Sequence, residues 1–230
     1  MAPVNPVPVG RGRSDDDSGA LRRLMVEQQL RQRGIADERV LAAMVRVPRE
    51  RFVPEEIVEH AYDDAALGIH CHQTISQPYT VAFMAEALEL TGNEIVLEIG
   101  AGSGYGAAIL SQLAREVHTV ERIPELAAEC RERLRLLGYA NVTVHTTDGS
   151  LGLPQHAPYD GIVVTAGAPQ LPAPLVEQLA IGGRLVIPIG TARSSQQMTR
   201  FTRYPDGLVE ERLGHFAFVP LIGTYGWPSE

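Results

Sequence analysis

The chain has 230 residues, of which 44% are hydrophobic and 21% charged, enough for one α/β domain with a well-filled core. Its formal net charge of −8 argues against a broad surface for nucleic acid, so we expect no nucleic-acid partner. No apolar run reaches the roughly 18–20 residues that cross a bilayer, so we expect no membrane partner. The two cysteines are too few for a disulfide framework, which favours a reducing cytoplasm.

The N-terminal part of the chain predicts helices behind a disordered tail. Residues 1–18 cannot bury a core, so we expect them to be disordered. A helix is predicted from Ala20 to a C-cap at Gly34. A second helix is predicted from an N-cap at Asp37 to a stop before Pro48.

A polar loop precedes the best-defined strand. Residues 73–79 read Q-T-I-S-Q-P-Y and lead into a helix whose apolar stripe begins at Val81. Because a rigid element positions the loop beside it, such loops commonly carry binding residues, and we predict a substrate gate here. His70-Cys71-His72 invites a metal site, but neighbouring residues of an extended loop point to opposite sides. No second ligand cluster is near in the sequence, so we expect no metal.

Residues 94–105, E-I-V-L-E-I-G-A-G-S-G-Y, organise the rest of the chain. The apolar run of residues 95–99 reads as a strand buried on both faces. It ends in Gly100, Gly102 and Gly104, which permit a tight turn and a close approach of the backbone to a ligand. Apolar residues at helical spacing follow, so the turn opens into a helix N-terminus with free N–H groups. This order of strand, glycine-rich turn and helix predicts a nucleotide-type site at the carboxyl edge of an open sheet.

Three interpretations compete for this turn. The dinucleotide fingerprint G-x-G-x-x-G/A fits only when it starts late, on Gly102, Gly104 and Ala107. Glu98-x-Gly100-x-Gly102-x-Gly104 is instead the spacing typical of S-adenosylmethionine methyltransferases. The third interpretation is a turn whose glycines are purely structural.

Acidic residues at the next two strand ends help to choose between them. Glu121 ends the run 117–121, and its carboxylate can accept hydrogen bonds from both ribose hydroxyls in either cofactor class. Asp148 follows the run 142–145, where methyltransferases commonly place an acidic residue beside the adenine. Sites at three successive strand ends favour S-adenosyl-L-methionine as the cofactor.

Downstream, the chain alternates helices and strands as doubly wound α/β folds do. The predicted helices are residues 124–137 and 174–179, and the predicted strands are residues 142–145, 159–165, 184–189, 196–204 and 208–219. We expect a single methyltransferase domain over residues 19–230. Its N-terminal helices and substrate loop take residues 19–92, and its cofactor-binding sheet takes residues 93–230. The fold class is therefore α/β, doubly wound and Rossmann-like, with N-terminal helices.

Six motifs together resemble the protein-L-isoaspartate (D-aspartate) O-methyltransferase family over residues 20–222. They are Q-T-I-S-Q-P (73–78), V-L-E-I-G-A-G-S-G-Y (96–105), V-E-R-I (120–123), D-G (148–149), Y-D-G-I-V-V-T-A (159–166) and F-V-P-L (218–221). The resemblance implies a seven-stranded methyltransferase sheet in which the last two strands exchange their usual order. It also implies protein repair, in which the methyl group of S-adenosyl-L-methionine moves to the free carboxylate of L-isoaspartyl and D-aspartyl residues. We expect damaged proteins and peptides as partners of a monomeric, cytoplasmic enzyme.

The resemblance and the motifs also assign roles to individual residues. By resemblance, Ser76 is the active-site serine. The expected cofactor-binding residues are Gln73, Thr74, Ile75, Glu98, Gly100, Gly102, Ser103, Gly104, Glu121, Arg122, Asp148, Gly149 and Thr165. The expected substrate-binding residues are Ser76, Gln77, Pro78, Tyr79, Val219, Pro220 and Leu221.

The expected reaction needs no general base. A carboxylate acceptor with a pKa of roughly 3.3–4.3 is ionised at neutral pH, so the enzyme has only to position and desolvate it. The Ser76 hydroxyl can donate a hydrogen bond to one carboxylate oxygen and leave the other to attack. Ser76 has no base partner in its motif, so we do not expect it to act as a nucleophile. Its structural alternative is an N-cap for the helix after Pro78.

Two further hypotheses and one departure from the family pattern remain. A methyltransferase for another acceptor is the second hypothesis, but the D/N-P-P-Y/F motif of amino methylases is replaced by Thr165-Ala166-Gly167. A non-catalytic S-adenosylmethionine-binding module is the third. The departure is at His70 and His72, where glycine is usual. It places two side chains in a loop that is expected to close over substrate.

Overall fold

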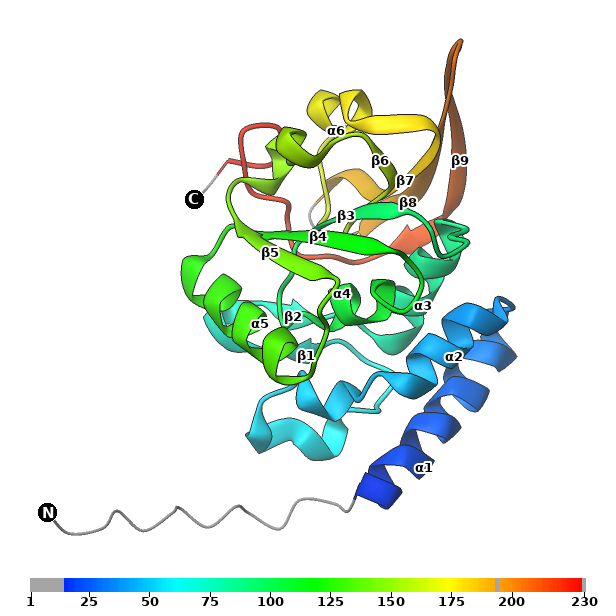
Figure 1. Ribbon diagram of the computed structural model, residues 1–230, viewed down its shortest axis with the longest axis vertical. Helices are drawn as coiled ribbons and strands as arrows, with labels where there is room; N and C mark the ends of the chain where they lie inside the picture. Colours follow the sequence, from blue (N-terminus) through cyan, green and yellow to red (C-terminus); the bar gives the residue numbers. More distant parts are fainter. Residues whose placement is uncertain (1–14, 193–194, 229–230) are drawn as a thin grey trace, which may run out of the picture.

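The computed structural model describes residues 15–192 and 195–228, and its centre is a seven-stranded sheet in the order β5-β4-β3-β6-β7-β8-β9 (Figure 1). Strands β3 to β7 pair in parallel, whereas β8 and β9 are antiparallel to their neighbours. The strands are β3 (Ile95–Ile99), β4 (Glu116–Glu121), β5 (Val142–Thr146), β6 (Tyr159–Val164), β7 (Leu179–Ala192), β8 (Ser195–Tyr204) and β9 (Gly207–Phe216). The predicted doubly wound, Rossmann-like α/β fold is confirmed.

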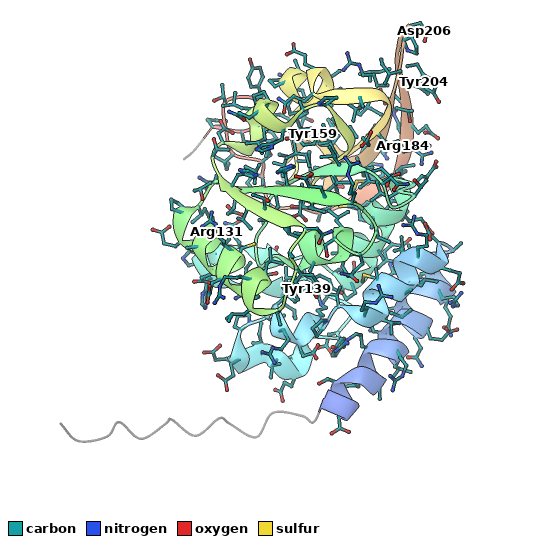
Figure 2. The ribbon with its side chains drawn as sticks, viewed as in Figure 1. Arg131, Tyr139, Tyr159, Arg184, Tyr204 and Asp206 are labelled. Carbon is teal, nitrogen blue, oxygen red and sulfur yellow. The ribbon has the colours of Figure 1, made fainter. Side chains whose placement is uncertain are left out.

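The strand order places the topological switch point between β3 and β6. From β3 the chain moves outward through β4 to β5, and then returns to the other side of β3 with β6. Ligands of open α/β sheets bind at such a point, beyond the carboxyl ends of the strands. The last two strands follow chain order, with β8 beside β7 and β9 at the edge, as the resemblance implied. Their hairpin extends beyond the sheet, with Tyr204 and Asp206 near its tip (Figure 2).

Helices cover both faces of the sheet. One face packs against the N-terminal helices and α3 to α5, through buried residues that include Val96, Val117 and Val163. The other face packs against α6 and the segment after β5, through Leu97, Ile162 and Leu175 among others. The helices are α1 (Asp15–Met25), α2 (Glu38–Arg46), α3 (Pro78–Ala87), α4 (Tyr105–Leu110), α5 (Pro124–Leu136) and α6 (Ala173–Glu177). Across the described ranges, every helix is too short or too polar to cross a membrane.

The first helix begins earlier than predicted. It starts at Asp15, inside the stretch expected to be a disordered tail, and Ser18 is already buried. Acidic residues are favoured in the first turn of a helix because the helix dipole is positive there, and the tail prediction overlooked this signal. Residues 1–14 of the predicted tail lie outside the described residues. The helix continues through a π-helical segment (Val26–Leu30) and ends at Gly34, whose φ of 100° confirms the predicted C-cap.

Two strand boundaries also differ from the prediction. Strand β7 begins at Leu179 rather than Arg184, because its first residues pair with the start of β6. Strand β9 ends at Phe216, so residues 217–219 leave the sheet earlier than expected. An additional two-stranded ribbon pairs the start of the predicted substrate loop, β2 (Thr74–Ile75), with β1 (Leu67–Gly68) just before it.

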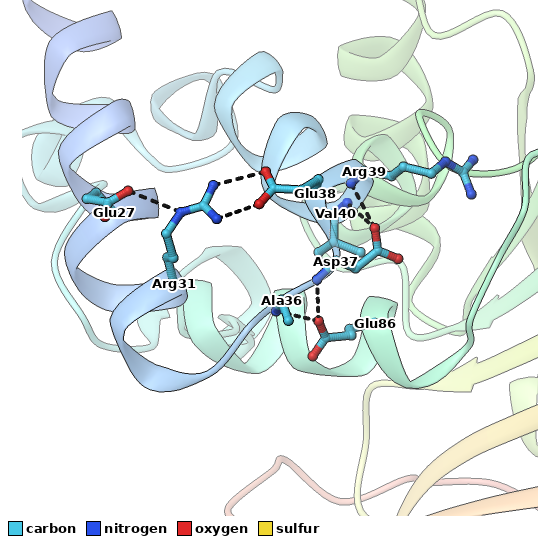
Figure 3. Close-up of polar contacts among 8 residues, drawn as sticks. All are labelled: Glu27, Arg31, Ala36, Asp37, Glu38, Arg39, Val40 and Glu86. Carbon is cyan, nitrogen blue, oxygen red and sulfur yellow. Dashed lines mark hydrogen bonds and ion pairs between the residues drawn. The ribbon is translucent and has the colours of Figure 1, made fainter.

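The start of α2 is held by two carboxylates (Figure 3). Asp37 is the N-cap, as predicted, and its Oδ1 accepts hydrogen bonds from the backbone N–H groups of Arg39 (2.7 Å) and Val40 (3.4 Å). Glu86, on α3, accepts from the backbone N–H groups of Ala36 and Asp37, both at 2.7 Å. These contacts tie α2 to the helix that follows the predicted substrate loop.

Removing this cap is expected to destabilise the protein modestly. Asp37→Ala leaves two helix N–H groups without their side-chain acceptor, which costs about 1 kcal/mol. Urea unfolding followed by circular dichroism measures the loss. Asp37→Ser is the matched control, because serine is also a good N-cap and should restore most of the stability. An equal loss in both variants would contradict a capping role.

Candidate active site

A cavity of about 560 Å³ opens at the carboxyl ends of β3, β4 and β6. Its wall combines the turn after β3, the loop before α3, the ends of the neighbouring strands and the segment after β9. Most of the residues predicted for cofactor and substrate meet here. They are Gln73, Thr74, Ile75, Ser76, Gln77, Tyr79, Glu98, Gly100, Gly102, Ser103, Glu121, Arg122, Gly149, Thr165, Val219, Pro220 and Leu221.

The turn after β3 depends on glycine at Gly100. Its φ is 100°, in the left-handed region, and a Cβ there would lie 2.4 Å from the Oγ1 of Thr165. Thr165 is fixed, because its hydroxyl donates to the carbonyl oxygens of Ile99 (3.0 Å) and Gly100 (2.8 Å). The close approach of β6 to the turn thus leaves no room for a side chain.

Glu98 places a buried carboxylate in the wall of the cavity. The residue is 1% exposed, and the hydroxyl of Thr119 donates to its Oε2 at 2.6 Å. Burial raises the pKa of Glu98 to about 8; the Thr119 hydrogen bond opposes this shift, and the nearby negative charge of Glu121 adds to it. Across residues 15–192 and 195–228, Glu98 forms no ion pair, and Thr119 is its hydrogen-bond partner.

Glu121 holds the glycine turn in place. Its Oε2 accepts a hydrogen bond from the N–H of Gly102 at 3.1 Å, and its Oε1 accepts from the N–H of Ile123 at 3.0 Å. Each carboxylate oxygen can accept a second hydrogen bond, so the side chain retains capacity toward the cavity.

The loop before α3 brings Ser76 to the cavity. The β1–β2 ribbon fixes the loop, and Ile75 is buried beneath it. Within the described part of the chain, no group hydrogen bonds with the Ser76 hydroxyl, which lines the cavity and is available to a ligand. The N-cap of α3 is Gln77, and it makes no side-chain capping bond. The alternative interpretation of Ser76 as this cap is therefore wrong.

The rim of the cavity carries a polar network. Gln77 donates to Asp64 at 2.7 Å, and Arg33 forms an ion pair with the same carboxylate at 2.9 Å. The Arg33 guanidinium also lies 3.8 Å from the centre of the Tyr79 ring. Two loops and the end of the first helix are thereby joined beside Ser76.

His70 and His72 do not line the cavity. The Nδ1 of His70 lies 2.9 Å from the Oε1 of Glu129 on α5. Cys71 and His72 have φ values of 57° and 56°, in the left-handed region that favours glycine. This geometry accounts for the glycine that the family usually carries at position 72, and histidine there is strained.

Three predicted site residues also lie outside the cavity wall: Pro78, Gly104 and Asp148. Pro78 is the first residue of α3, and Gly104 is the N-cap of α4. Asp148 accepts hydrogen bonds from Ser150 through one oxygen and from Thr224 through the other, at 2.7–2.9 Å. Desolvation opposes these bonds, but together they lower the pKa of Asp148. The structure thus turns this carboxylate toward the C-terminal segment.

Other wall residues were missed by the sequence analysis. Arg33 comes from the end of the first helical segment, and His215, Phe216, Phe218 and Ile222 come from the chain around the end of β9. Only the F-V-P-L motif at residues 218–221 signalled this segment. Nothing in the local sequence of Arg33 separates it from a solvated helix residue.

The fold and the site define the class. A parallel sheet with a glycine-rich turn after its central strand, acidic residues at that strand and the next, and a cavity at the switch point together identify a Rossmann-like S-adenosylmethionine-dependent methyltransferase. The family model described as protein-L-isoaspartate (D-aspartate) O-methyltransferase matches residues 22–226. The chain belongs to this family.

Relatives and solved structures agree with this placement. The chain is 56% identical over 213 residues to protein-L-isoaspartate O-methyltransferase 2 of Marinobacter nauticus, covering 92% of this chain and 97% of the relative. It is 55% identical to the Protochlamydia amoebophila enzyme of the same name, covering 89% and 98%. A solved protein-L-isoaspartate O-methyltransferase superposes with a TM-score of 0.80 at 30% identity, covering 89% of this chain and 67% of the other. A Plasmodium falciparum chain in complex with S-adenosyl-L-homocysteine superposes with a TM-score of 0.74 at 26% identity, covering 87% of this chain and 98% of the other.

Proposed function

We propose that this protein methylates the free carboxylate of L-isoaspartyl and D-aspartyl residues in damaged proteins and peptides. The observation that carries the proposal is that the glycine turn after β3 and the unengaged hydroxyl of Ser76 line one and the same cavity. One end of such a cavity suits a nucleoside cofactor, and the other suits a small anionic acceptor.

The residues of the cavity fit S-adenosyl-L-methionine, which supplies a methyl group on a positively charged sulfur. The backbone of Gly100 and Gly102 permits close approach of the cofactor. The carboxylate of Glu121 adds negative charge that complements a cation, and a bound cation would favour the ionised form of Glu98. In this proposal Glu121 accepts hydrogen bonds from the ribose hydroxyls. Asp148 acts indirectly, by holding residues 222–224, while its neighbour Gly149 contacts the cofactor.

The acceptor carboxylate needs to be held rather than activated. It is ionised at neutral pH, so no proton has to be removed before it attacks. Ser76 would donate a hydrogen bond to one oxygen and leave the second oxygen free to attack the methyl group that the cofactor supplies. Gln77, Tyr79 and residues 219–221 would hold the peptide backbone around it.

The selectivity for isoaspartyl over normal aspartyl residues follows from the way in which the site holds the substrate's peptide backbone. In an isoaspartyl residue the chain runs through the side chain, so the free α-carboxylate lies close to the backbone. A normal aspartyl carboxylate lies one methylene further out. A site that fixes the backbone then presents the wrong atom, and a displacement of about 1 Å can reduce the rate about a hundredfold.

The oligomeric state, the domain organisation and the cellular location are part of the same proposal. Arg33 and Ser76 from the N-terminal part and Glu98 from the sheet line one cavity, which supports a single domain that begins with α1. A monomeric enzyme is part of the same proposal. Cys71 and Cys130 are both free thiols, which supports a cytoplasmic location.

Paired peptides test the proposal. Two peptides of one sequence, containing either isoaspartate or normal aspartate, are incubated with tritiated S-adenosyl-L-methionine. We expect labelling of the isoaspartyl peptide at least about a hundredfold faster, as an ester that releases methanol in mild alkali. Label that survives alkali, or equal labelling of both peptides, would point to another acceptor. Binding of the cofactor without labelling of either peptide would favour a non-catalytic module.

Ser76→Ala is the variant for the same assay. Loss of a hydrogen bond to a charged group costs about 1.5–3 kcal/mol, so turnover should fall roughly tenfold to a hundredfold. Cofactor affinity, measured by calorimetry, should stay near the wild-type value. An unchanged turnover number would remove Ser76 from the mechanism without touching the assignment of the substrate.

A further inference from the structure

Three histidines meet on the sheet face that packs against α6, outside the cavity described above. They are His118 on β4, His145 on β5 and His156 on the short turn η7 (Pro154–His156). Their candidate ligand atoms all lie within 4.8 Å of one another. Tyr159, labelled in Figure 2, lies beside them, with its ring centroid 6.1 Å from that of His118. His118 is buried, His145 is half-buried and His156 is exposed.

The β4–β5 pairing fixes the first two histidines. Val120 lies opposite His145 in the parallel register, so His118, two residues before Val120, projects from the same face as His145. The Nδ1 of His118 lies 3.1 Å from the Nε2 of His145. Two nitrogens bound to one tetrahedral Zn²⁺ are about 3.3 Å apart, because each Zn–N bond is about 2.0–2.1 Å. The spacing of this pair therefore already suits a shared metal ion.

A carboxylate orients the buried histidine. The Nε2 of His118 lies 3.0 Å from the Oε1 of Glu116, so the Nε2–H donates to this carboxylate. The lone pair then lies on Nδ1, the nitrogen that faces His145. Metal-binding histidines almost always donate their second N–H to a carboxylate, carbonyl or water in this way. Glu116 is thus a second, independent feature of a metal site.

We propose that His118 Nδ1, His145 Nε2 and a ring nitrogen of His156 bind one Zn²⁺ ion, with water as the fourth ligand. Imidazole suits zinc, and three protein ligands with one open position form a common zinc site. His156 stacks on His118, with centroids 4.1 Å apart and an angle of 29° between the rings. It has to turn from this position to bind the ion, and its exposure gives it the room.

The ion would act as a clamp between the sheet and the segment that begins at the cavity. Residues 149–158 run from Gly149, in the cavity wall, to the start of β6, and His156 lies near the end of this segment. Gln178 already holds its middle, by donating to the Leu151 carbonyl and accepting from the Leu153 N–H. None of the three histidines lines the cavity, so we assign the ion no part in methyl transfer.

Zinc binding to the metal-free protein tests the proposal. The full chain is dialysed against EDTA and then buffer, and titrated with ZnCl₂ by calorimetry. We expect one ion per chain and a rise in the melting temperature, since a ligand that binds only the folded state stabilises it. Co²⁺ in place of Zn²⁺ should give the visible absorption of a tetrahedral site. Absence of stoichiometric binding would overturn the proposal.

Variants locate the ion. His156→Ala changes an exposed side chain and should abolish the rise in melting temperature and most of the affinity. Glu116→Gln should weaken binding about tenfold to a hundredfold and leave the ligands in place. His60→Ala, at an exposed histidine paired with Asp63, is the matched control and should bind as wild type does. Wild-type affinity in both His156→Ala and His145→Gln, or loss of binding in His70→Ala, would place the ion elsewhere and refute the site.

Discussion

Gly100→Val is expected to abolish measurable binding of S-adenosyl-L-methionine. A Cβ at Gly100 would lie 2.4 Å from the Oγ1 of Thr165, well inside contact distance, and the φ of 100° is strained for any β-branched residue. The turn can relieve the clash only by moving, and it is the turn that the cofactor approaches. Isothermal titration calorimetry on the folded variant measures the loss.

Two controls separate the clash from general strain. Gly182 also has a positive φ, 83°, but nothing lies within 4 Å of a Cβ built there, so Gly182→Val should carry the backbone strain and still bind the cofactor. Thr165→Ala removes the atom that a new Cβ would meet. Gly100→Ala combined with Thr165→Ala should therefore bind better than Gly100→Ala alone, a positive coupling between neighbouring sites. Folded Gly100→Val with wild-type affinity would show that the turn does not contact the cofactor.

The strands and the glycine turn could be predicted because their signals are local. The apolar run at residues 95–99 needs no distant partner to be recognised, and the spacing of Gly100, Gly102 and Gly104 matches the backbone that the turn requires. The N-cap at Asp37 and the C-cap at Gly34 depend on neighbouring residues in the same way. These predictions were confirmed.

The site residues that were misplaced or missed share a different cause, since each depends on residues far apart in the sequence. Asp148 was expected beside the adenine, but one oxygen of its carboxylate accepts from Thr224, 76 residues away, and the other accepts from Ser150. Arg33 reaches the cavity rim only because Asp64 and Tyr79 fold against it. His118, His145 and His156 come together through the β4–β5 register and a turn that no local pattern predicts. Contacts of this kind are set by topology, which a single sequence does not display.

Glu98→Gln is expected to remove part of the decrease in protein stability that accompanies rising pH. The pKa of Glu98 is raised from 4.5 to about 8 in the folded protein, chiefly by burial. Between these values the folded state keeps a proton that the unfolded state has released, so the free energy of unfolding falls as pH rises. The loss is absent below pH 4.5 and complete above pH 8, and it amounts to on the order of 3–5 kcal/mol. Glutamine has nearly the same shape and carries no charge, so the variant should lack this loss.

The difference in the free energy of unfolding between the wild type and Glu98→Gln reports the ionisation of Glu98. Urea unfolding of both, without cofactor, should show similar stability near pH 5 and a growing advantage for Glu98→Gln up to pH 8. Glu56→Gln, at an exposed carboxylate, should show no such trend. The same variant is expected to bind S-adenosyl-L-methionine roughly tenfold to a hundredfold more weakly, because an ionised Glu98 would attract the positively charged cofactor. Stability that falls equally in both proteins would mean that Glu98 is already ionised without the cofactor, and that its burial is offset by contacts other than the Thr119 hydroxyl.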